Sequence, residues 1–568
     1  MAFPFNQGHR IVPTLRRATL AIVTTAFSTA VATAVTTSLA GAQTAAAIVP
    51  IQEIDANLRF LSSDLLEGRA PATRGGALAE EYIATRLESY GIQPGANGSY
   101  YQKVPIDVVT ADPKTITVTA SGKATATLHS TNDVVVWAGS AEPRSEARGE
   151  VVFVGYGARA PEYKWDDFKG MDLKGKILLV LVNDPPATSV EPDLFGGKAM
   201  TYYGRWTYKY EEAERQGAAG MLIIHTTAAA SYPWQVVVGS NSTEHRLLPR
   251  PSDAPAPIGV RGWIQHDVAA DLLKQAGLDL DQLVKQADTR EFHPVPTGIM
   301  MDMSFANSVA HMTASNIVGV IHGSDPKLSS QYVVYSAHHD HLGIGPAVNG
   351  DSIYNGAYDN ASGVAAILAV AHAASRAPVK PKRSQLFVFV TAEESGLLES
   401  QYFGEHPVVP ARDIIAALNV DEANPLGPVR DVNVLGDNKS SLGPSLAQML
   451  KPEGMRISPD AQPQAGHFYR SDHFSFARVG IPAVSIGAGT DFVGKPAGWG
   501  KAHEEEYTSK HYHQPSDEYD PHWPLTGVEQ LAGIVYGFGT RLANTATLPT
   551  WDANAEFRAM REKSMRSE

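Results

Sequence analysis

The sequence predicts an α/β fold in which a mixed, mainly parallel central sheet is flanked by helices and interrupted by a β-rich insert. The first observation is that apolar, β-rich runs at 331–337, 384–392 and 413–420 read as buried strands. The second is that residues 361–374, between two of these strands, carry apolar residues at helical spacing. The third is a change of character from about residue 131, where further apolar strands are separated by turn-rich sequence. Together they indicate an α/β domain with an insert.

Acids or histidines follow each of the three predicted strands, 331–337, 384–392 and 413–420. They are His338, His339, Asp340 and His341 after the first, Glu393 and Glu394 after the second, and Asp421 after the third. Asp359 stands where the helix between them begins, and His511 and His513 lie in a later loop. Open α/β sheets bind ligands outside the carboxyl ends of their strands, so these side chains are expected to meet at one edge.

The residue types at this edge favour a metal centre. Carboxylate oxygens combined with imidazole nitrogens suit zinc and, less specifically, manganese or cobalt. One carboxylate can bridge two ions about 3.5–4 Å apart, as two-metal hydrolases require. Asp359 is the natural bridge, because it is central in the sequence and fixed at a helix start.

Six motifs run in order from residue 337 to 517: A-H-H-D-H-L-G, G-A-Y-D-N-A-S-G, T-A-E-E-S-G-L-L, N-V-D, S-D-H-F-S-F and Y-H-Q-P-S-D. This set resembles the secreted co-catalytic di-zinc aminopeptidases, whose superfamily also includes the glutamate carboxypeptidases, the glutaminyl cyclases and the transferrin receptor. The resemblance implies the di-zinc exopeptidase fold. It also implies a secreted zinc metallopeptidase that hydrolyses the N-terminal bond of peptide substrates.

The resemblance also implies a role for each site residue. The metal ligands would be His338, Asp359, Glu394, Asp421 and His513. They would hold two Zn²⁺ ions, with Mn²⁺ or Co²⁺ as possible substitutes. Asp359 would bridge the ions, His338 and Asp421 would complete one site, and Glu394 and His513 the other. Glu393 would be the general base that takes a proton from the attacking water, and Tyr512 would stabilise the oxyanion.

Neighbouring residues are expected to support this set. Asp340 would accept a hydrogen bond from a ligand imidazole, and Asp517 would orient the loop of His513. Asp472 and His473 are expected at the pocket wall. Tyr358 occupies a position at which many members of the family that this sequence resembles have Asp.

Residues 1–42 are predicted to be a signal peptide, with three arginines, an apolar run and a final A-G-A. The protein is therefore expected to be exported, to the periplasm or the extracellular space, without membrane attachment after cleavage. An uncleaved anchor is the alternative. The net charge of −13 argues against nucleic-acid binding, and the absence of cysteine excludes disulfides and thiolate ligands. Nothing in the sequence indicates an oligomeric state.

The change in sequence pattern at about residue 131 divides the mature chain into a catalytic domain and an insert. Residues 43–130 are expected to form the N-terminal part of the catalytic domain, beginning with amphipathic helices over 50–95. Residues 131–295 resemble an inserted protease-associated (PA) domain, and 296–568 the main part of the catalytic domain. We expect a pocket-lining loop at 488–512, a last helix at 525–542 and a mobile tail after Leu548.

Three other functions remain open. A di-zinc carboxypeptidase would need basic groups for the substrate α-carboxylate. A glutaminyl cyclase or related amidohydrolase would typically hold one zinc. A non-catalytic receptor-like binding protein would have lost ligands or the base, and this chain has lost none.

Overall fold

The computed structural model describes residues 49–230, 232–242, 244–250 and 254–566. The predicted signal peptide, residues 1–42, lies outside the described residues. Among the helices of the described ranges, none combines the length and the apolar character needed to cross a membrane.

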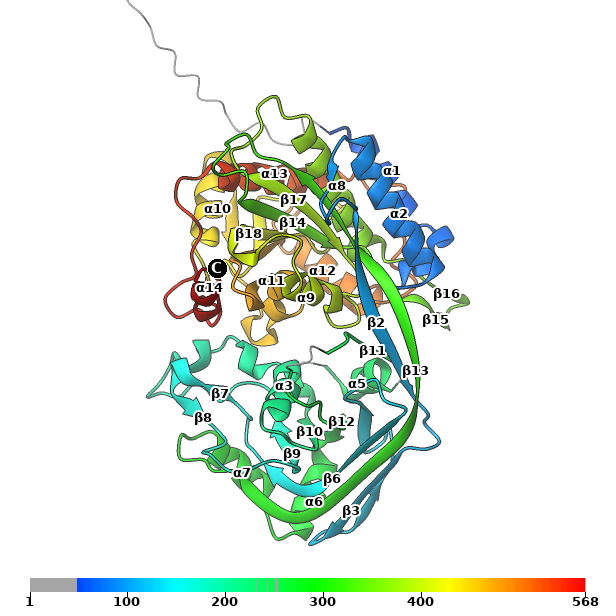
Figure 1. Ribbon diagram of the computed structural model, residues 1–568, viewed down its shortest axis with the longest axis vertical. Coiled ribbons are helices and arrows are strands. Elements are labelled where there is room, and N and C mark those ends of the chain that lie inside the picture. Colours follow the sequence, from blue (N-terminus) through cyan, green and yellow to red (C-terminus); the bar gives the residue numbers. More distant parts are fainter. Residues whose placement is uncertain (1–48, 231, 243, 251–253, 567–568) are drawn as a thin grey trace, which may run out of the picture. The chain divides into compact units, whose positions relative to one another are not determined.

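The catalytic sheet is mixed and mainly parallel, as predicted (Figure 1). Its parallel centre is formed by β17 (Ser384–Val390), β14 (Tyr332–His338), β18 (Ile414–Asn419) and β21 (Ala483–Ala488). Antiparallel strands flank this centre, with the second half of β13 (Val295–Ile321) beside β17 and β19 (Asp431–Leu435) beside β21. The small strands β1 (Gln93–Pro94) and β20 (Arg456–Ser458) add to the edges.

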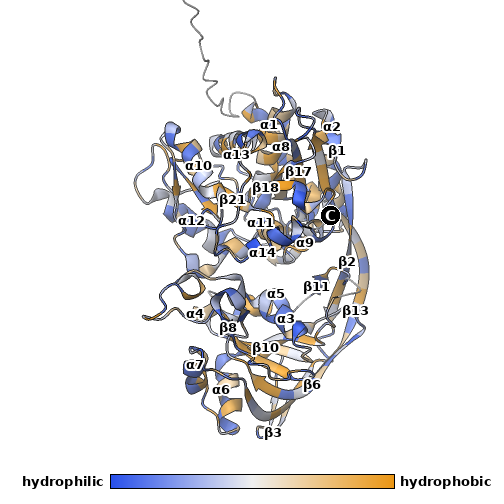
Figure 2. Ribbon diagram, turned by 60° about the vertical axis from the view of Figure 1, so that its left-hand side comes forward, coloured by the Kyte–Doolittle hydropathy of each residue, from blue (hydrophilic) through white to orange (hydrophobic). Residues whose placement is uncertain are grey.

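Helices cover both faces of this sheet, and the largest core lies beneath one layer of them. Helix α8 (Gly363–Ser375) is buried along almost its whole length. It packs against α1 (Ile51–Leu61), α2 (Arg74–Ser89) and α13 (Thr526–Asn544). The remaining helices of this part are α9 (Leu398–Glu405), α10 (Leu442–Leu450), α11 (His473–Arg478), α12 (Trp499–Lys510) and α14 (Arg558–Ser564). The central strands are mostly hydrophobic (Figure 2), as expected for a sheet covered on both faces.

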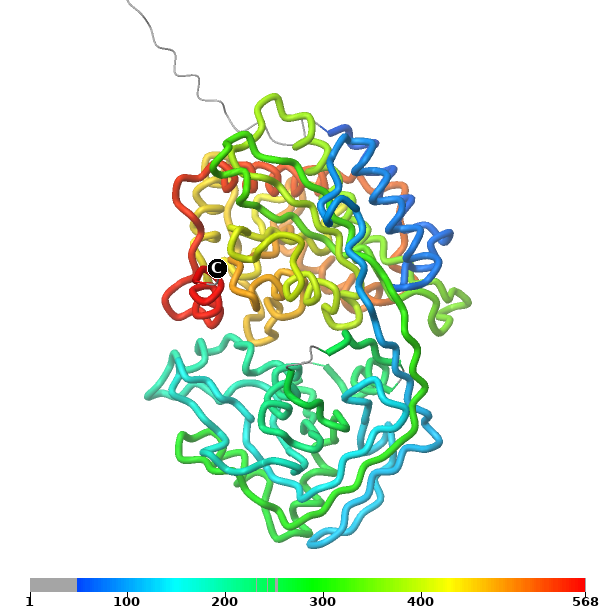
Figure 3. The backbone as a smooth tube through the Cα atoms, viewed as in Figure 1, coloured from blue at the N-terminus to red at the C-terminus, as the bar shows by residue number. Residues whose placement is uncertain are grey.

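The long strand β13 connects the catalytic sheet to a second sheet (Figure 3). Its second half pairs with β2 (Tyr101–Ala111), and its first half pairs with β3 (Thr117–Gly122) and β6 (Arg144–Phe153). The chain thus leaves the catalytic part along β2 and returns along β13. The antiparallel pairing of these strands holds the exit and the return together.

The second sheet has two hydrophobic cores of its own, one on each face. Its parallel centre is β6, β9 (Ile177–Leu181), β10 (Gly220–His225) and β12 (Val260–Gln265), with β5 (Val134–Ala138) antiparallel to β12 and β4 (Ala126–Leu128) beside β3. The helices of this region are α3 (Trp206–Arg215), α4 (Thr227–Ala230), α5 (Trp234–Asn241), α6 (His266–Gln275) and α7 (Leu280–Ala287). Smaller strands are β7 (Arg159–Ala160), β8 (Trp165–Asp166) and β11 (Glu244–Leu247). The assignment of residues 131–295 to a PA domain stays a prediction.

Two local expectations were wrong. Residues 488–512 are not a continuous loop, because α12 occupies most of the second half of that segment. The tail after Leu548 is anchored, since Trp551 and Phe557 are each 5% exposed and pack with Phe468 and Phe474. Neither segment shows a clear hydrophobic period, because α12 carries few apolar residues and the tail carries its apolar residues singly.

Candidate metal centre

The ends of three parallel strands bring the predicted ligands to one edge of the catalytic sheet. His338 is the last residue of β14, and it pairs in register with Val390 at the end of β17. Glu393 and Glu394 follow β17 after a short turn, and Asp421 follows β18. The turn that leads into α8 brings Asp359 to the same place, and the loop after α12 brings His513. All five predicted ligands therefore converge.

His338, Asp359 and Asp421 form one group of donor atoms. The Nε2 atom of His338 lies 3.3 Å from Oδ1 of Asp359 and 3.2 Å from Oδ1 of Asp421. Zinc bound tetrahedrally, with bonds of about 2.0–2.1 Å, places neighbouring ligand atoms about 3.3 Å apart. The side chains of His338 and Asp359 are almost completely buried, at 1% and 5% exposure. The spacing and the burial both fit a bound zinc ion.

Asp359, Glu394 and His513 form a second group on the other side of Asp359. The Nε2 atom of His513 lies 3.3 Å from Oδ2 of Asp359 and 3.0 Å from Oε2 of Glu394. The two oxygens of Asp359 thus face different groups, which is the arrangement of a carboxylate that bridges two ions. The Glu394 side chain is 4% exposed, so its charge needs a cationic partner. The donor set fits two zinc ions.

Asp340 fixes the loops that carry the ligands. Its two carboxylate oxygens accept hydrogen bonds from the backbone N–H groups of Glu393 and Glu394, at 3.2 and 3.4 Å. Its Oδ1 also lies 3.6 Å from Nδ1 of His338, on the side of the ring opposite the donor group. Asp340 is fully buried. It therefore orients both the histidine and the pair of glutamates.

Asp517 and Asn360 hold the turn of Asp359. The Asp517 carboxylate accepts hydrogen bonds from the backbone N–H groups of Tyr358 and Asp359, at 2.9 and 3.1 Å. The side chain of Asn360 donates to the Val420 carbonyl and accepts from the Glu422 N–H. Asp517 also accepts from the Tyr507 hydroxyl at 3.1 Å and donates its backbone N–H to the Gln514 carbonyl at 3.0 Å, so it contacts the loop of His513 as well as the turn of the bridging residue.

Glu393 and Tyr512 lie beside the donor groups. Burial raises the pKa of Glu393 well above its usual range, and the nearby Glu394 and Asp421 raise it further, against the opposing effect of His338. The Tyr512 ring stacks on the His513 ring with 3.9 Å between centroids, and Tyr512 is 41% exposed. A carboxylate and an exposed phenol therefore flank the centre.

The remaining predicted neighbours are buried around the centre. Asp472 and His473 are both fully buried, and the His473 ring packs edge-on against Phe468 at 4.8 Å. Tyr358 packs against Tyr507 at 4.6 Å and donates only its backbone N–H near the site. The absence of an aspartate at position 358 thus leaves the donor groups intact.

Two residues that sequence reasoning missed support the centre directly. The hydroxyl of Ser471 donates to Oδ2 of Asp421 at 2.7 Å, which leaves Oδ1 for the donor group. The buried guanidinium of Arg69 donates to the backbone carbonyl of His339 and to that of Gly356. Ser471 lies in the S-D-H-F-S-F motif noted above and Arg69 lies in the sequence L-L-E-G-R, but neither segment shows which atom the residue would contact.

The shared position of Asp359 leads to a prediction about metal content. Asp359→Ala should lower the content from two zinc ions per chain toward zero, because each donor group loses a ligand. His338→Ala should remove only one ion, because Asp359, Glu394 and His513 remain. Metal analysis after gel filtration would measure both. Equal loss in the two variants would contradict the bridging position of Asp359.

The segment that carries this centre is similar to known proteins. Residues 316–534 match the model of peptidase family M28. Over 247 residues the chain is 27% identical to leupeptin-inactivating enzyme 1 of Streptomyces exfoliatus, covering 42% of this chain and 50% of that protein. Over 132 residues it is 30% identical to aminopeptidase NAALADL1 of Mus musculus, covering 22% of this chain and 16% of that protein. The chain thus spans half or less of the length of these relatives.

Among solved structures, the aminopeptidase from Aneurinibacillus sp. strain AM-1 aligns with a TM-score of 0.48 and 19% identity, over 88% of this chain and 95% of that one. The M28 match includes every residue of the two donor groups, as well as Glu393 and Tyr512. The part of the chain that carries the metal centre, residues 316–534, is thus the part that matches the model of peptidase family M28.

Proposed function

We propose that this protein is an exported aminopeptidase that removes N-terminal residues from peptides at a two-zinc centre. The observation that carries the proposal is the position of Asp359, whose two carboxylate oxygens face two separate groups of metal donors. A centre of this kind is suited to hydrolysis rather than to structural metal binding. The M28 match and the aminopeptidase name of one relative support the choice of reaction.

When bound, two zinc ions supply a nucleophilic water at neutral pH and polarise the scissile carbonyl. Glu393 is placed to take the proton of that water, because it lies at the centre and belongs to neither donor group. The backbone N–H of Glu393 donates to Asp340, and this hydrogen bond fixes the backbone from which the Glu393 side chain extends. The same carboxyl can then return the proton to the departing amine.

Tyr512 is the second group proposed to act on the substrate. Its ring is fixed by stacking on His513, while its exposure leaves the side chain accessible to a peptide. Partial desolvation of the hydroxyl and the neighbouring carboxylates of Asp359 and Glu394 raise the pKa of Tyr512 well above its usual range, which keeps the hydroxyl protonated as a donor. A donor aimed at developing negative charge stabilises the transition state more than the ground state.

The proposal extends to the rest of the chain. Residues 1–42 act as the export signal, and residues 131–295 form a PA domain. The exit strand β2 pairs along its whole length with residues 307–317 of the return strand β13, which is consistent with an insertion into the catalytic domain.

The proposal is tested by metal content measured together with substrate choice. The purified mature protein should contain two zinc ions per chain. It should hydrolyse aminoacyl-anilides and leave N-acylated peptides intact. Two ions with cleavage from the carboxyl end would instead identify a carboxypeptidase. One ion with cyclisation of N-terminal glutamine would identify a cyclase, and a protein without turnover would be a binding protein.

A further inference from the structure

His341 is a buried imidazole that none of the roles above uses. It follows β14 by three residues and is 0% exposed. In the described part of the chain, neither its Nδ1 nor its Nε2 atom has a hydrogen-bond partner. Burying a polar group without a partner is unfavourable, so such groups are rare and often mark the site of a bound ion or water.

The surroundings of His341 indicate which ligand is missing. Its Nδ1 atom lies 2.6 Å from Oε1 of the buried Glu394 carboxylate, but the two atoms are not aligned as a hydrogen bond. The His341 ring lies edge-on to the ring of His513, with 5.7 Å between centroids. The Nε2 atom of His513 is the fourth buried atom here that lacks a hydrogen bond. Three side chains, His341, Glu394 and His513, therefore direct donor atoms into one small space.

The same space already contains an oxygen of Asp359. His341, Asp359 and Glu394 each offer one donor atom within 4.8 Å of the others. Nδ1 of His341 faces Oε1 of Glu394, whereas His513 faces Oε2 of the same residue. The two histidines thus contact different oxygens of Glu394, so both can lie beside this carboxylate at the same time.

We propose that His341 is a fourth protein ligand of the ion held by Asp359, Glu394 and His513. The inference rests on the two-zinc centre proposed above and goes beyond the five ligands that the resemblance implies. The ion beside His338 would then have three protein ligands, and its neighbour would have four. Zinc sites with four protein ligands are closed, whereas catalytic sites keep a position open for water or substrate.

This difference predicts an order of metal loss. The ion of His338 and Asp421 is the one that keeps an open position, and it should leave first when a chelator is added. The ion of His341 should be retained to a higher chelator concentration. His341→Ala should remove that advantage.

The test is zinc retention against increasing chelator, followed by metal analysis, in the wild type, His341→Ala and His341→Asn. Asparagine keeps an N–H donor near the position of Nδ1, but it is not one of the side chains that bind zinc well. His522→Ala is the matched control, because the His522 side chain is 90% exposed and pairs only with Asp520. Circular dichroism would show that each variant remains folded.

If His341 is a ligand, Ala and Asn should both lower the affinity for the retained ion by more than the roughly 10–100-fold that loss of a hydrogen-bond partner of a ligand costs. Replacement of zinc by Co²⁺ would report on coordination directly, because its visible absorption changes with the number of ligands. Retention at the wild-type level in the Asn variant would overturn the inference and leave His341 as a hydrogen-bond donor to Glu394. Fewer than two ions in the wild type would instead refute the two-zinc centre itself.

Discussion

Glu393→Ala should lower kcat by about 10²–10⁴-fold, the usual contribution of a general base, while both zinc ions stay bound. Glu393 lies beside the donor groups without belonging to either of them, so its removal takes away a proton acceptor and no ligand. The isosteric Glu393→Gln should have the same effect, because an amide cannot take a proton from water. Steady-state kinetics on an aminoacyl-anilide, with metal analysis of the same sample, would measure both effects.

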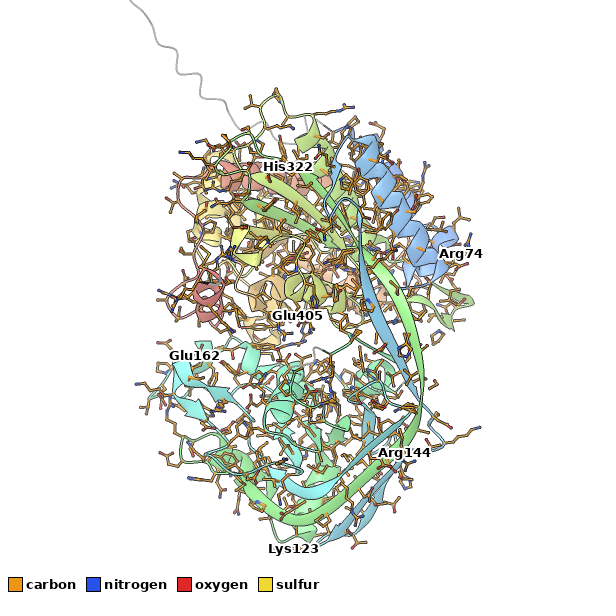
Figure 4. All side chains as sticks on the ribbon, viewed as in Figure 1. Arg74, Lys123, Arg144, Glu162, His322 and Glu405 are labelled. Atoms are coloured by element: carbon orange, nitrogen blue, oxygen red, sulfur yellow. The ribbon has the colours of Figure 1, made fainter. Side chains whose placement is uncertain are left out.

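Glu405→Gln is the matched control for this experiment. Glu405, labelled in Figure 4, lies on the exposed side of α9 and accepts a hydrogen bond only from Gln401. Its substitution should change neither kcat nor zinc content. Activity within severalfold of the wild type in Glu393→Ala would remove Glu393 as the base. A loss of zinc in the same variant would make it a ligand instead.

The sequence predicted the parts of the site that depend on strand ends. Glu394 and Asp421 could be placed together because each follows an apolar run, and parallel strands bring such positions to one edge. The roles of His338, His339 and His341 were harder to predict, because the direction of each side chain depends on the backbone torsions after the strand ends. The structure turns His338 toward Asp359 and His339 toward the carbonyl of Ser315. His341 points to Glu394, which the sequence did not predict.

Residues that support the site through long-range hydrogen bonds could not be predicted in the same way. Asn360 and Ser471 bond to neighbours 50 or more residues away, so local patterns carry no trace of the contact. Arg69 lies 270 residues before one of its partners, and charged residues are mostly exposed, so no sequence pattern predicts that it lies in the core. The buried tail residues Trp551 and Phe557 were missed because single aromatics have no periodicity.

Arg69→Ala should reduce the free energy of unfolding by more than about 3 kcal/mol, because several buried carbonyls would lose their donor at once. The Arg69 guanidinium is 1% exposed and donates four hydrogen bonds. Its partners are the backbone carbonyls of Leu61, His339, Asn355 and Gly356, at 2.5, 2.9, 2.5 and 3.0 Å. The bonds link the end of α1 to the segments that lead to His338 and Asp359. Urea unfolding followed by tryptophan fluorescence would measure the loss.

Arg69→Lys separates geometry from charge in this position. A lysine keeps the positive charge, but its compact ammonium cannot reproduce the planar fork of donors that reaches four carbonyls. We therefore expect Arg69→Lys to lose most of the same stability and to bind zinc more weakly, since both ligand-bearing segments would be released. Arg74→Ala is the control, because Arg74 on α2 is 70% exposed and forms only a 3.5 Å ion pair with Glu67 (Figure 4). Wild-type stability and zinc affinity in Arg69→Lys would show that the charge alone matters there, through the buried carboxylates Asp340 and Asp517 that surround it.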